Sequence, residues 1–237
     1  MVYSSAGFGD TIFYSRYLEL LKQKNINLFL YVQNPLKSLY EELGYNVVTD
    51  LKSQKFDYQI SFMSLANLFK TSLDTIPFSK GFIKISSKKE LNTTKKKVGL
   101  VWKSGAKTNR NLELIELAEL FKMGGLQFYS LQKEITQEEK EILNMFGILD
   151  LSDKLSDFKE TASYIDALDV VAGCDTAVTN LSCAMGKETL LLLPYFSDFR
   201  WGISEFWSPW YDAAKNFRQV MQDAWKKPRE NMLDYIR

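Results

Sequence analysis

The stretch Ser4-Ser5-Ala6-Gly7-Phe8-Gly9-Asp10-Thr11-Ile12 follows a short apolar start and leads into an amphipathic segment. This order predicts a strand, a glycine turn at Gly7 and Gly9, and a helix that begins at Thr11. Glycines allow a sharp turn and the close approach of a ligand, and the amino end of a helix attracts anions. Asp10 lies at the turn, where a carboxylate either caps the helix or serves as a general base facing a cleft.

The remaining chain consists of two series of alternating strands and helices, separated by the polar, lysine-rich segment 86–97. In the first series we expect strands at 1–3, 26–32, 47–48 and 57–62, with helices beginning near 11, 34 and 65. In the second we expect strands at 98–102, 126–131, 148–151, 170–173, 190–193 and 216–219, with helices between them.

Strands that alternate with helices form parallel sheets of βαβ units. The sequence therefore predicts an α/β protein with two Rossmann-like domains, at 1–93 and 94–237, and segment 86–97 as the linker. We expect the final helix, 221–236, to pack back on the first domain. Ligands of such sheets bind beyond the carboxyl ends of strands and between domains, which places the turn at Asp10 across a cleft from the loops 103–111 and 175–176.

Composition excludes several classes of protein. The chain has 237 residues, of which 46% are hydrophobic, and 30 basic against 29 acidic residues give a net charge of +1. That balance argues against a nucleic-acid-binding protein, which usually carries a strong excess of basic residues. The chain contains no apolar run of about 18 residues, so the sequence predicts no membrane-spanning helix. The two cysteines, Cys174 and Cys183, have no metal-ligand spacing, and together with the lack of a secretory signal they indicate a cytoplasmic protein. The absence of histidine excludes Ser-His-Asp and Cys-His catalysis, so carboxylates, lysines or tyrosines must do any acid–base work.

Three segments are candidates for ligand contacts. The loop from Lys103 to Arg110 carries cations, hydroxyls and a glycine after a buried strand, a composition that suits a diphosphate and that also occurs in solvated loops. At Asp175-Thr176-Ala177, small residues open a helix, and Asp175 either accepts hydrogen bonds from a ribose or caps the helix. The aromatic segment from Arg200 to Tyr211 either stacks on a sugar or base or forms a packed plug between domains.

Taken together and in order, these pieces resemble the heptosyltransferase-like glycosyltransferases of family nine, and most of all the transferase region of members associated with tetratricopeptide repeats. The matching pieces are Gly7-Phe8-Gly9-Asp10-Thr11-Ile12, Arg16-Tyr17-Leu18, 72–77, 98–102, 130–133, Asp157-Phe158, Thr161-Ala162, 175–178, Leu193-Pro194, Arg200-Trp201 and 208–211.

The resemblance implies a GT-B architecture, with two Rossmann-like domains facing a cleft, a nucleotide-diphosphate sugar in the second half and an acceptor in the first. It implies an inverting transfer without a metal or other cofactor, in which Asp10 is the general base. The residues expected to contact the donor are Ser104, Lys107, Arg110, Gln132, Asp157, Asp175, Thr176, Ala177 and Asn180, and those expected on the acceptor side are Arg16, Arg200 and Trp201. The implied acceptor is a glycan, a lipid-linked saccharide or a protein, with at most peripheral contact to a membrane.

One position departs from the family pattern. The helix after the aspartate–threonine pair usually carries a histidine near the donor phosphates, and Asn180 stands there in this chain. An amide still donates a hydrogen bond but carries no charge. Two alternatives to an active transferase therefore stay open, namely a non-catalytic nucleotide- or glycan-binding module of the same fold and, less attractively without histidine, a nucleotide-sugar epimerase.

Overall fold

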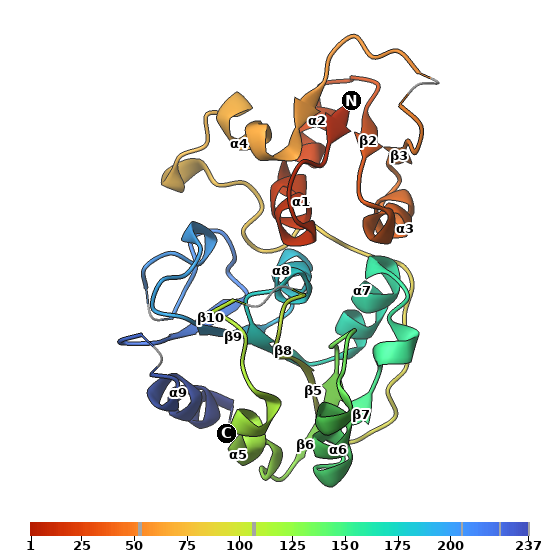
Figure 1. Ribbon diagram of the computed structural model, residues 1–237. Coiled ribbons are helices and arrows are strands. Elements are labelled where there is room, and N and C mark those ends of the chain that lie inside the picture. Colours follow the sequence, from red (N-terminus) through yellow and green to blue (C-terminus); the bar gives the residue numbers. More distant parts are fainter. Residues whose placement is uncertain (52–53, 106–107, 205, 223, 237) are drawn as a thin grey trace.

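The computed structural model describes residues 1–51, 54–105, 108–204, 206–222 and 224–236, which form two sheets, each with helices around it (Figure 1). The first half contains β1 (Val2–Tyr3), α1 (Phe8–Tyr14), the 3-10 helix η1 (Ser15–Tyr17), α2 (Leu18–Lys22), β2 (Phe29–Tyr31), α3 (Asn34–Glu42), β3 (Asn46–Val47), β4 (Ile60–Ser61), η2 (Phe62–Ser64), α4 (Leu65–Leu68) and η3 (Leu73–Thr75).

The first sheet is parallel and has the strand order β3-β2-β1-β4. Val2 pairs with Leu30 on one side and with Ile60 on the other, which makes β1 an inner strand. The order reverses at β1, because the chain first adds strands on one side of it and then returns to the other side. The turn after β1, which carries Asp10, thus follows an inner strand at this reversal, where ligands of open parallel sheets bind.

The second half contains β5 (Lys96–Val101), η4 (Leu114–Leu117), α5 (Ala118–Phe121), β6 (Leu126–Ser130), α6 (Gln137–Met145), β7 (Leu149–Asp150), η5 (Ser152–Lys154), α7 (Phe158–Ala167), β8 (Val170–Cys174), α8 (Ala177–Ala184), β9 (Thr189–Leu193), η6 (Phe199–Trp201), β10 (Ala214–Arg218) and α9 (Lys226–Ile236). Its parallel sheet has the order β10-β9-β8-β5-β6-β7, the arrangement of a doubly wound nucleotide-binding sheet. The reversal lies between β5 and β8, whose following loops are 103–111 and 175–176.

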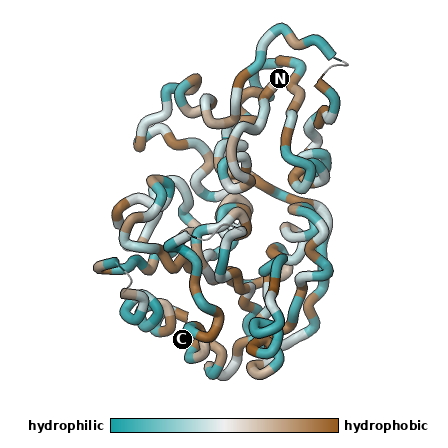
Figure 2. Tube along the Cα trace, viewed as in Figure 1, coloured by the Kyte–Doolittle hydropathy of each residue, from teal (hydrophilic) through white to brown (hydrophobic). Residues whose placement is uncertain are grey.

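Burial explains why these strands read as continuous apolar runs. Every residue of β8 and β9 is buried, because helices cover both faces of the sheet. Figure 2 shows hydrophobic residues along the strands inside the second half, and polar residues on its outer helices. The prediction of an α/β protein with two parallel sheets is therefore confirmed.

The final helix packs on the second half, so the expectation that it returns to the first half was wrong. Met232 and Ile236 of α9 share a hydrophobic core with Leu192 of β9 and Phe217 of β10. The Tyr235 hydroxyl also donates to a Glu188 carboxylate oxygen at 2.7 Å. The chain reaches α9 directly from β10, and the apolar face of α9 covers the nearest strands.

The two halves touch along two pairs of helices (Figure 1). Helix α1 packs against α8, and α3 packs against α7. At the second contact, the Ser38 hydroxyl donates to Asp157 Oδ2 at 2.8 Å. No helix in the described part of the chain combines the length and the apolar character that a membrane crossing requires.

The segment after the first half also binds the second half. Residues 81–85 form no strand; the backbone N–H groups of Phe82 and Ile83 both donate to the carbonyl of Ala184, at 2.7 and 2.9 Å. Gly81 has a φ of +113°, and a Cβ on it would lie 2.8 Å from the backbone nitrogen of Gly186. Only glycine fits where this segment crosses the end of α8.

Candidate active site

A cavity of about 1500 Å³ lies where the carboxyl ends of the strands of the two sheets face each other. Loops after three strands line it, as the sequence predicted: the turn after β1, the loop after β5 and the residues after β8. Among the expected site residues that line it are Gly7, Gly9, Asp10, Ser104, Arg110, Gln132, Asp157, Asp175, Thr176, Ala177, Asn180 and Arg200. Lys107 lies outside the described residues.

Asp10 contacts both halves. The first helix begins at Phe8 rather than at Thr11, so Asp10 is the third residue of α1, and its Oδ2 accepts the backbone N–H of Gly7 at 3.0 Å. Its Oδ1 accepts from Arg200 Nη2 at 2.5 Å. The carboxylate therefore caps the helix and faces the cavity at once, so the two interpretations of Asp10 are compatible.

The glycine turn has a different role from the one predicted. Gly7 has a φ of −68°, and Gly9 lies inside α1, so neither position needs a left-handed backbone. A Cβ on Gly9 would lie 3.5 Å from Asn180 Nδ2 and 3.6 Å from the Cα of Ala177. The small residue at position 9 thus permits the close approach of α1 and α8 across the two halves.

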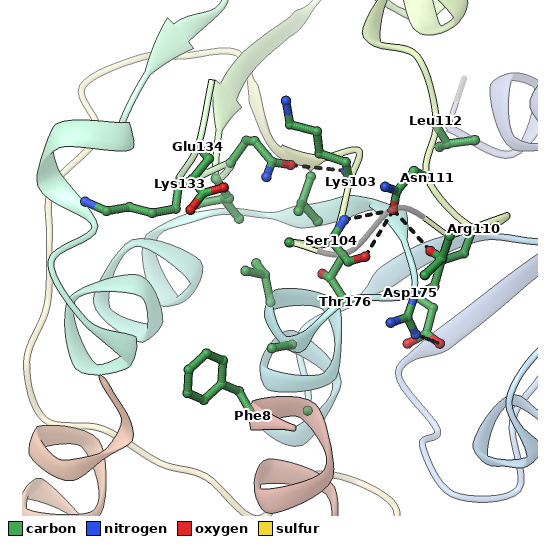
Figure 3. A pocket seen from close by; sticks show the side chains of 18 of the residues that line it. Phe8, Lys103, Ser104, Arg110, Asn111, Leu112, Lys133, Glu134, Asp175 and Thr176 are labelled. Carbon is green, nitrogen blue, oxygen red and sulfur yellow. Dashed lines mark hydrogen bonds and ion pairs between the residues drawn. The ribbon is translucent and has the colours of Figure 1, made fainter. Parts of the chain in front are cut away.

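The loop after β5 is held by its own side chains (Figure 3). The backbone N–H and the hydroxyl of Ser104 both donate to Asn111 Oδ1, at 3.0 and 3.1 Å. Arg110 Nη1 donates to Asp175 Oδ2 at 3.2 Å, so this cation reaches from the loop after β5 to the end of β8. Ser104, Arg110 and Asp175 lie together in this view, with Phe8 of the first half below them.

Gln132 contacts the backbone at the end of β5. Its Oε1 accepts the backbone N–H groups of Trp102 and Lys103, at 3.3 and 3.1 Å. Lys103 Nζ in turn donates to both oxygens of Glu139, and Trp102 Nε1 donates to Glu139 Oε1 at 2.6 Å. Burial alone would raise the pKa of Glu139, but the hydrogen bonds from Lys103, Thr136 and Trp102 lower the pKa overall.

Thr176, rather than Asp175, caps α8. The Thr176 hydroxyl accepts the backbone N–H of Thr179 at 3.3 Å. Asp175 is left to accept from Arg110 and, at 3.3 Å, from Asn180 Nδ2. Burial raises the pKa of Asp175 above its ordinary value, although the nearby charges of Arg200 and Arg110 oppose this shift.

Asn180 connects the two sides of the cavity. Its Nδ2 donates to Asp175 Oδ1 and to the carbonyl of Thr176, and its Oδ1 accepts from Arg200 Nη1 at 3.3 Å. These partners fix the orientation of the amide, because a carboxylate accepts and a guanidinium donates. The residue that departs from the family pattern is thus 1% exposed and fully engaged at the amino end of α8.

Asp157 caps α7 and contacts the first half. Its Oδ1 accepts the backbone N–H of Glu160 at 2.8 Å, while its Oδ2 accepts from Ser38. Both oxygens are engaged at the edge of the cavity, which gives this carboxylate a structural role in the contact between the halves.

Two residues expected on the acceptor side are closed to any ligand. Arg16 is 0% exposed and donates to the carbonyls of Phe13 and Trp210, at 3.0 and 2.9 Å. Trp201 is also 0% exposed, and its ring lies 5.8 Å from that of Tyr211. For Trp201, Trp210 and Tyr211 the aromatic segment is a packed plug, because Trp210 and Tyr211 lie against Arg16 and Trp201 packs on Tyr211.

Sequence reasoning missed several carboxylates that line the cavity, among them Glu139 and Asp198. Asp198 Oδ1 accepts from Arg200 Nε at 2.8 Å. Asp198 and Arg200 are two positions apart, so the sequence could have indicated the ion pair between them. Nothing in the local sequence shows that Arg200 also reaches Asp10. Glu139 belongs to the capping box of α6, in which the Thr136 hydroxyl accepts the backbone N–H of Glu139 at 3.2 Å.

The described residues contain no group of three or more His, Cys, Asp or Glu side chains placed to hold a metal ion.

Comparisons with known proteins were made by sequence and by structure. No protein-family model matches the chain, and no curated protein matches it in sequence. Among solved structures, the chain is similar to ADP-heptose lipopolysaccharide heptosyltransferase II of E. coli, with a TM-score of 0.72 and 9% identity over 99% of this chain and 96% of that one. It is also similar to the family 9 glycosyl transferase of Veillonella parvula DSM 2008, with a TM-score of 0.64 and 11% identity over 92% and 85% of the two chains.

A third similar structure is the E. coli heptosyltransferase WaaC with ADP-2-deoxy-2-fluoro heptose, with a TM-score of 0.64 and 10% identity over 100% of this chain and 99% of that one. The three matches extend over both halves and agree with the two facing parallel sheets. The chain therefore has the GT-B-like fold of the family 9 heptosyltransferases.

Proposed function

We propose that this protein is an inverting glycosyltransferase that moves a sugar from a nucleotide-diphosphate sugar to an acceptor hydroxyl, without a metal ion and with Asp10 as the general base. The observation that carries the proposal is the cavity between the two sheets. It holds Asp10 on one wall and, on the other, the amino end of α8 with Thr176 and the loop with Ser104. A base and an anion-binding site thus face each other across one space.

The proposed reaction uses Asp10 on one wall of the cavity and the diphosphate-binding residues on the other. Asp10 takes the proton of the acceptor hydroxyl as that oxygen attacks the anomeric carbon. The bond from this carbon to the diphosphate oxygen breaks on the opposite face, and the electron pair leaves with the nucleoside diphosphate. A single displacement of this kind inverts the configuration at the anomeric carbon.

The second half supplies stabilisation for the leaving diphosphate. The amino end of α8 is positive, and the hydroxyls of Ser104 and Thr176 lie nearby. The Ser104 hydroxyl donates to Asn111 Oδ1 at 3.1 Å, so it would turn from this partner to donate to a bound diphosphate. Arg110 contributes a fixed cation at the same edge of the sheet. Asp175 is placed to accept from a sugar or ribose hydroxyl, since it lines the cavity as an anion beside this group.

Both substrates fit in one cavity. A volume of about 1500 Å³ exceeds the roughly 300–1,000 Å³ of a typical small-molecule site. We propose a glycan, lipid-linked saccharide or protein as the acceptor, bound beside Asp10. ADP-sugars are the first donors to test, because the structure of WaaC contains an ADP-2-deoxy-2-fluoro heptose. Cys174 and Cys183 are unpaired and buried, which supports a cytoplasmic location, where nucleotide sugars would be available.

The test begins with thermal-shift screening of the purified protein against ADP-, UDP- and GDP-sugars. The donor that stabilises the protein is then incubated with an acceptor panel, and the nucleoside diphosphate released is measured. We expect Asp10→Asn to lower turnover by about 10²- to 10⁴-fold, the usual contribution of a general base, while donor binding stays within a few fold. Asp74→Asn, the same change at an exposed position of the first half, serves as the control.

Two results would contradict the proposal. Turnover by Asp10→Asn equal to that of the wild type would exclude Asp10 as the base. Donor binding without turnover on any acceptor would identify a non-catalytic binding module.

A further inference from the structure

Arg200 is the side chain through which the two halves meet inside the cavity. It lies in η6, after β9, and is only 6% exposed. Its three guanidinium nitrogens contact three different residues: Nη2 donates to Asp10 of the first half at 2.5 Å, Nη1 to Asn180 at 3.3 Å and Nε to Asp198 at 2.8 Å. A planar group with donors on three sides fixes all three partners relative to one another.

The guanidinium is itself held in place. The backbone N–H of Arg200 donates to Asp198 Oδ1 at 3.0 Å, and its carbonyl accepts from the Ser208 hydroxyl at 2.5 Å. The ring of Phe13 lies 4.9 Å from its central carbon. Burial alone would lower the pKa of Arg200, but the hydrogen bonds to Asp198 and Asp10 raise it, so the group is permanently charged.

Asp10 has little freedom because of this contact. Arg200 holds one carboxylate oxygen, and the backbone of Gly7 holds the other, at 3.0 Å. Two bonds in different directions set the plane of the carboxylate, while its side chain stays 29% exposed to the cavity. Each oxygen keeps a further lone pair for an acceptor hydroxyl.

The same guanidinium also connects to the residues that are proposed to bind the donor. Asn180 accepts from Arg200 and donates to Asp175, which pairs with Arg110. A continuous series of polar contacts thus runs from the proposed base, through Arg200, to the amino end of α8. This series makes the orientation of Asp10 depend on the second half of the molecule.

We propose that Arg200 is a positioning residue that orients the carboxylate of Asp10 toward the acceptor hydroxyl and links that orientation to the wall that binds the donor. The inference rests on the proposed function, because a base needs positioning only if transfer occurs. It replaces the expectation that Arg200 contacts the acceptor, since all of its nitrogens are engaged with protein.

Kinetics give this role a signature. A residue that positions the base acts on the chemical step, so its loss should lower kcat and leave the donor KM near the wild-type value. A purely structural loss would instead lower the unfolding midpoint and weaken donor binding as well.

The kinetic test is a double-mutant cycle with Asp10→Asn, Arg200→Gln and the double variant. We expect Arg200→Gln to lower kcat by about 10- to 100-fold, with the donor KM within about threefold, since a misplaced base slows the chemical step. In the Asp10→Asn background the same substitution should change kcat by less than about twofold, because residues that act as a unit are not additive. Arg200→Lys keeps the charge without the planar fork and should recover part of kcat.

Additive losses in the cycle would overturn the inference. A loss of tenfold or more in affinity for the nucleoside diphosphate alone, with kcat unchanged, would also overturn it and assign Arg200 to donor binding. If Arg200→Gln does not fold, the cycle is run with Arg200→Lys, which must lower kcat in the wild-type background and not beside Asp10→Asn.

A measurement independent of turnover completes the test. Urea unfolding of the wild type and of the same three variants follows the contact itself, and we expect the shifts in unfolding midpoint caused by Asp10→Asn and Arg200→Gln to be non-additive, because the two side chains are in direct contact. Additive shifts would overturn the inference. A wild type that transfers no sugar while the shifts are non-additive would refute the proposed function and leave the Asp10–Arg200 contact established, so the two failures are distinguishable.

Discussion

The buried charge of Asp175 should lower the stability of the folded protein. Asp175→Asn should therefore raise that stability while weakening the proposed activity. The side chain is 5% exposed, and burial raises its pKa even though Arg110 and Arg200 oppose the shift. A raised pKa means that the charged form is less favourable in the folded protein than in the unfolded chain, with these ion pairs already included. The structure thus predicts a net gain when the charge is removed.

The size of the gain follows from the contacts that change. An asparagine carbonyl still accepts from Asn180, which lies 3.3 Å away. The contact with Arg110 is lost, but that side chain is 36% exposed and becomes solvated, so the loss is at most about 0.5 kcal/mol. The gain should be about 1 kcal/mol, typical of a substitution that relieves strain at a functional site, or about 2–4 °C in Tm for a chain of this size.

The pH dependence checks the cause. Below about pH 4 the carboxyl is protonated in both states, and the variant and the wild type should be equally stable. As the pH rises, the unfolded chain ionises first and the wild type loses stability, until Asp175 also ionises in the folded protein. The difference between the proteins should therefore grow from about pH 4 and reach a plateau at higher pH.

The assay is denaturant unfolding of both proteins between pH 4 and 8, with donor binding measured at pH 7. Asp153→Asn, the same change at an exposed position, should alter stability by no more than about 0.5 kcal/mol. We expect donor affinity to fall about tenfold, since a charged acceptor beside the sugar is lost. Destabilisation of Asp175→Asn by more than 1 kcal/mol at pH 7 would show that the ion pairs outweigh burial and would refute the reasoning.

Two further changes test the scaffold of the site. Glu139→Gln should cost about 1.5–3 kcal/mol at pH 7, because it removes the charged partner of Lys103 and Trp102. The lowered pKa of Glu139 means that this stability is present above about pH 4.3 and is lost as the pH falls through the folded value, so urea unfolding should show a smaller cost at pH 3 than at pH 7. Gly173→Ala should prevent stable folding, since its Cβ would lie 1.8 Å from the carbonyl oxygen of Val101 in the neighbouring strand. The control Gly124→Ala should fold normally, because no atom lies within 4 Å of its added Cβ. Equal solubility and equal unfolding midpoints for the two variants would contradict the packing around Gly173.

The sequence predicts the sheets well because their signals are local. Buried parallel strands appear as continuous apolar runs, such as 190–193, and several helix starts carry a capping residue, such as Thr136 or Asp157. The alternation of these elements determines which loops share the carboxyl edge of a sheet. The cavity and the three loops that contribute to its lining could be predicted for that reason.

The contacts inside the site depend on distances that no local pattern encodes. Arg200 and Asp10 are separated by 190 positions, and the sequence shows nothing that brings them together. The same holds for Arg16, whose charge predicts an exposed side chain and which lies fully buried among aromatic rings from both halves. At 175–176 the sequence offered Asp175 as a capping residue, and the Thr176 hydroxyl makes the bond instead.

The topology of the two sheets explains why the proposed reaction is divided between the halves. Each sheet reverses its strand order beside its first strand, β1 in one half and β5 in the other, and each first strand ends at the cavity. The first half thus contributes Asp10 from one reversal point, and the second contributes the loop with Ser104 and the end of β8 from the other. Neither half alone contains both the proposed base and the proposed diphosphate site. Arg200, which follows β9, contacts Asp10 across the two halves, so under the proposed function the base is oriented for transfer only when the residues proposed to bind the donor lie opposite it.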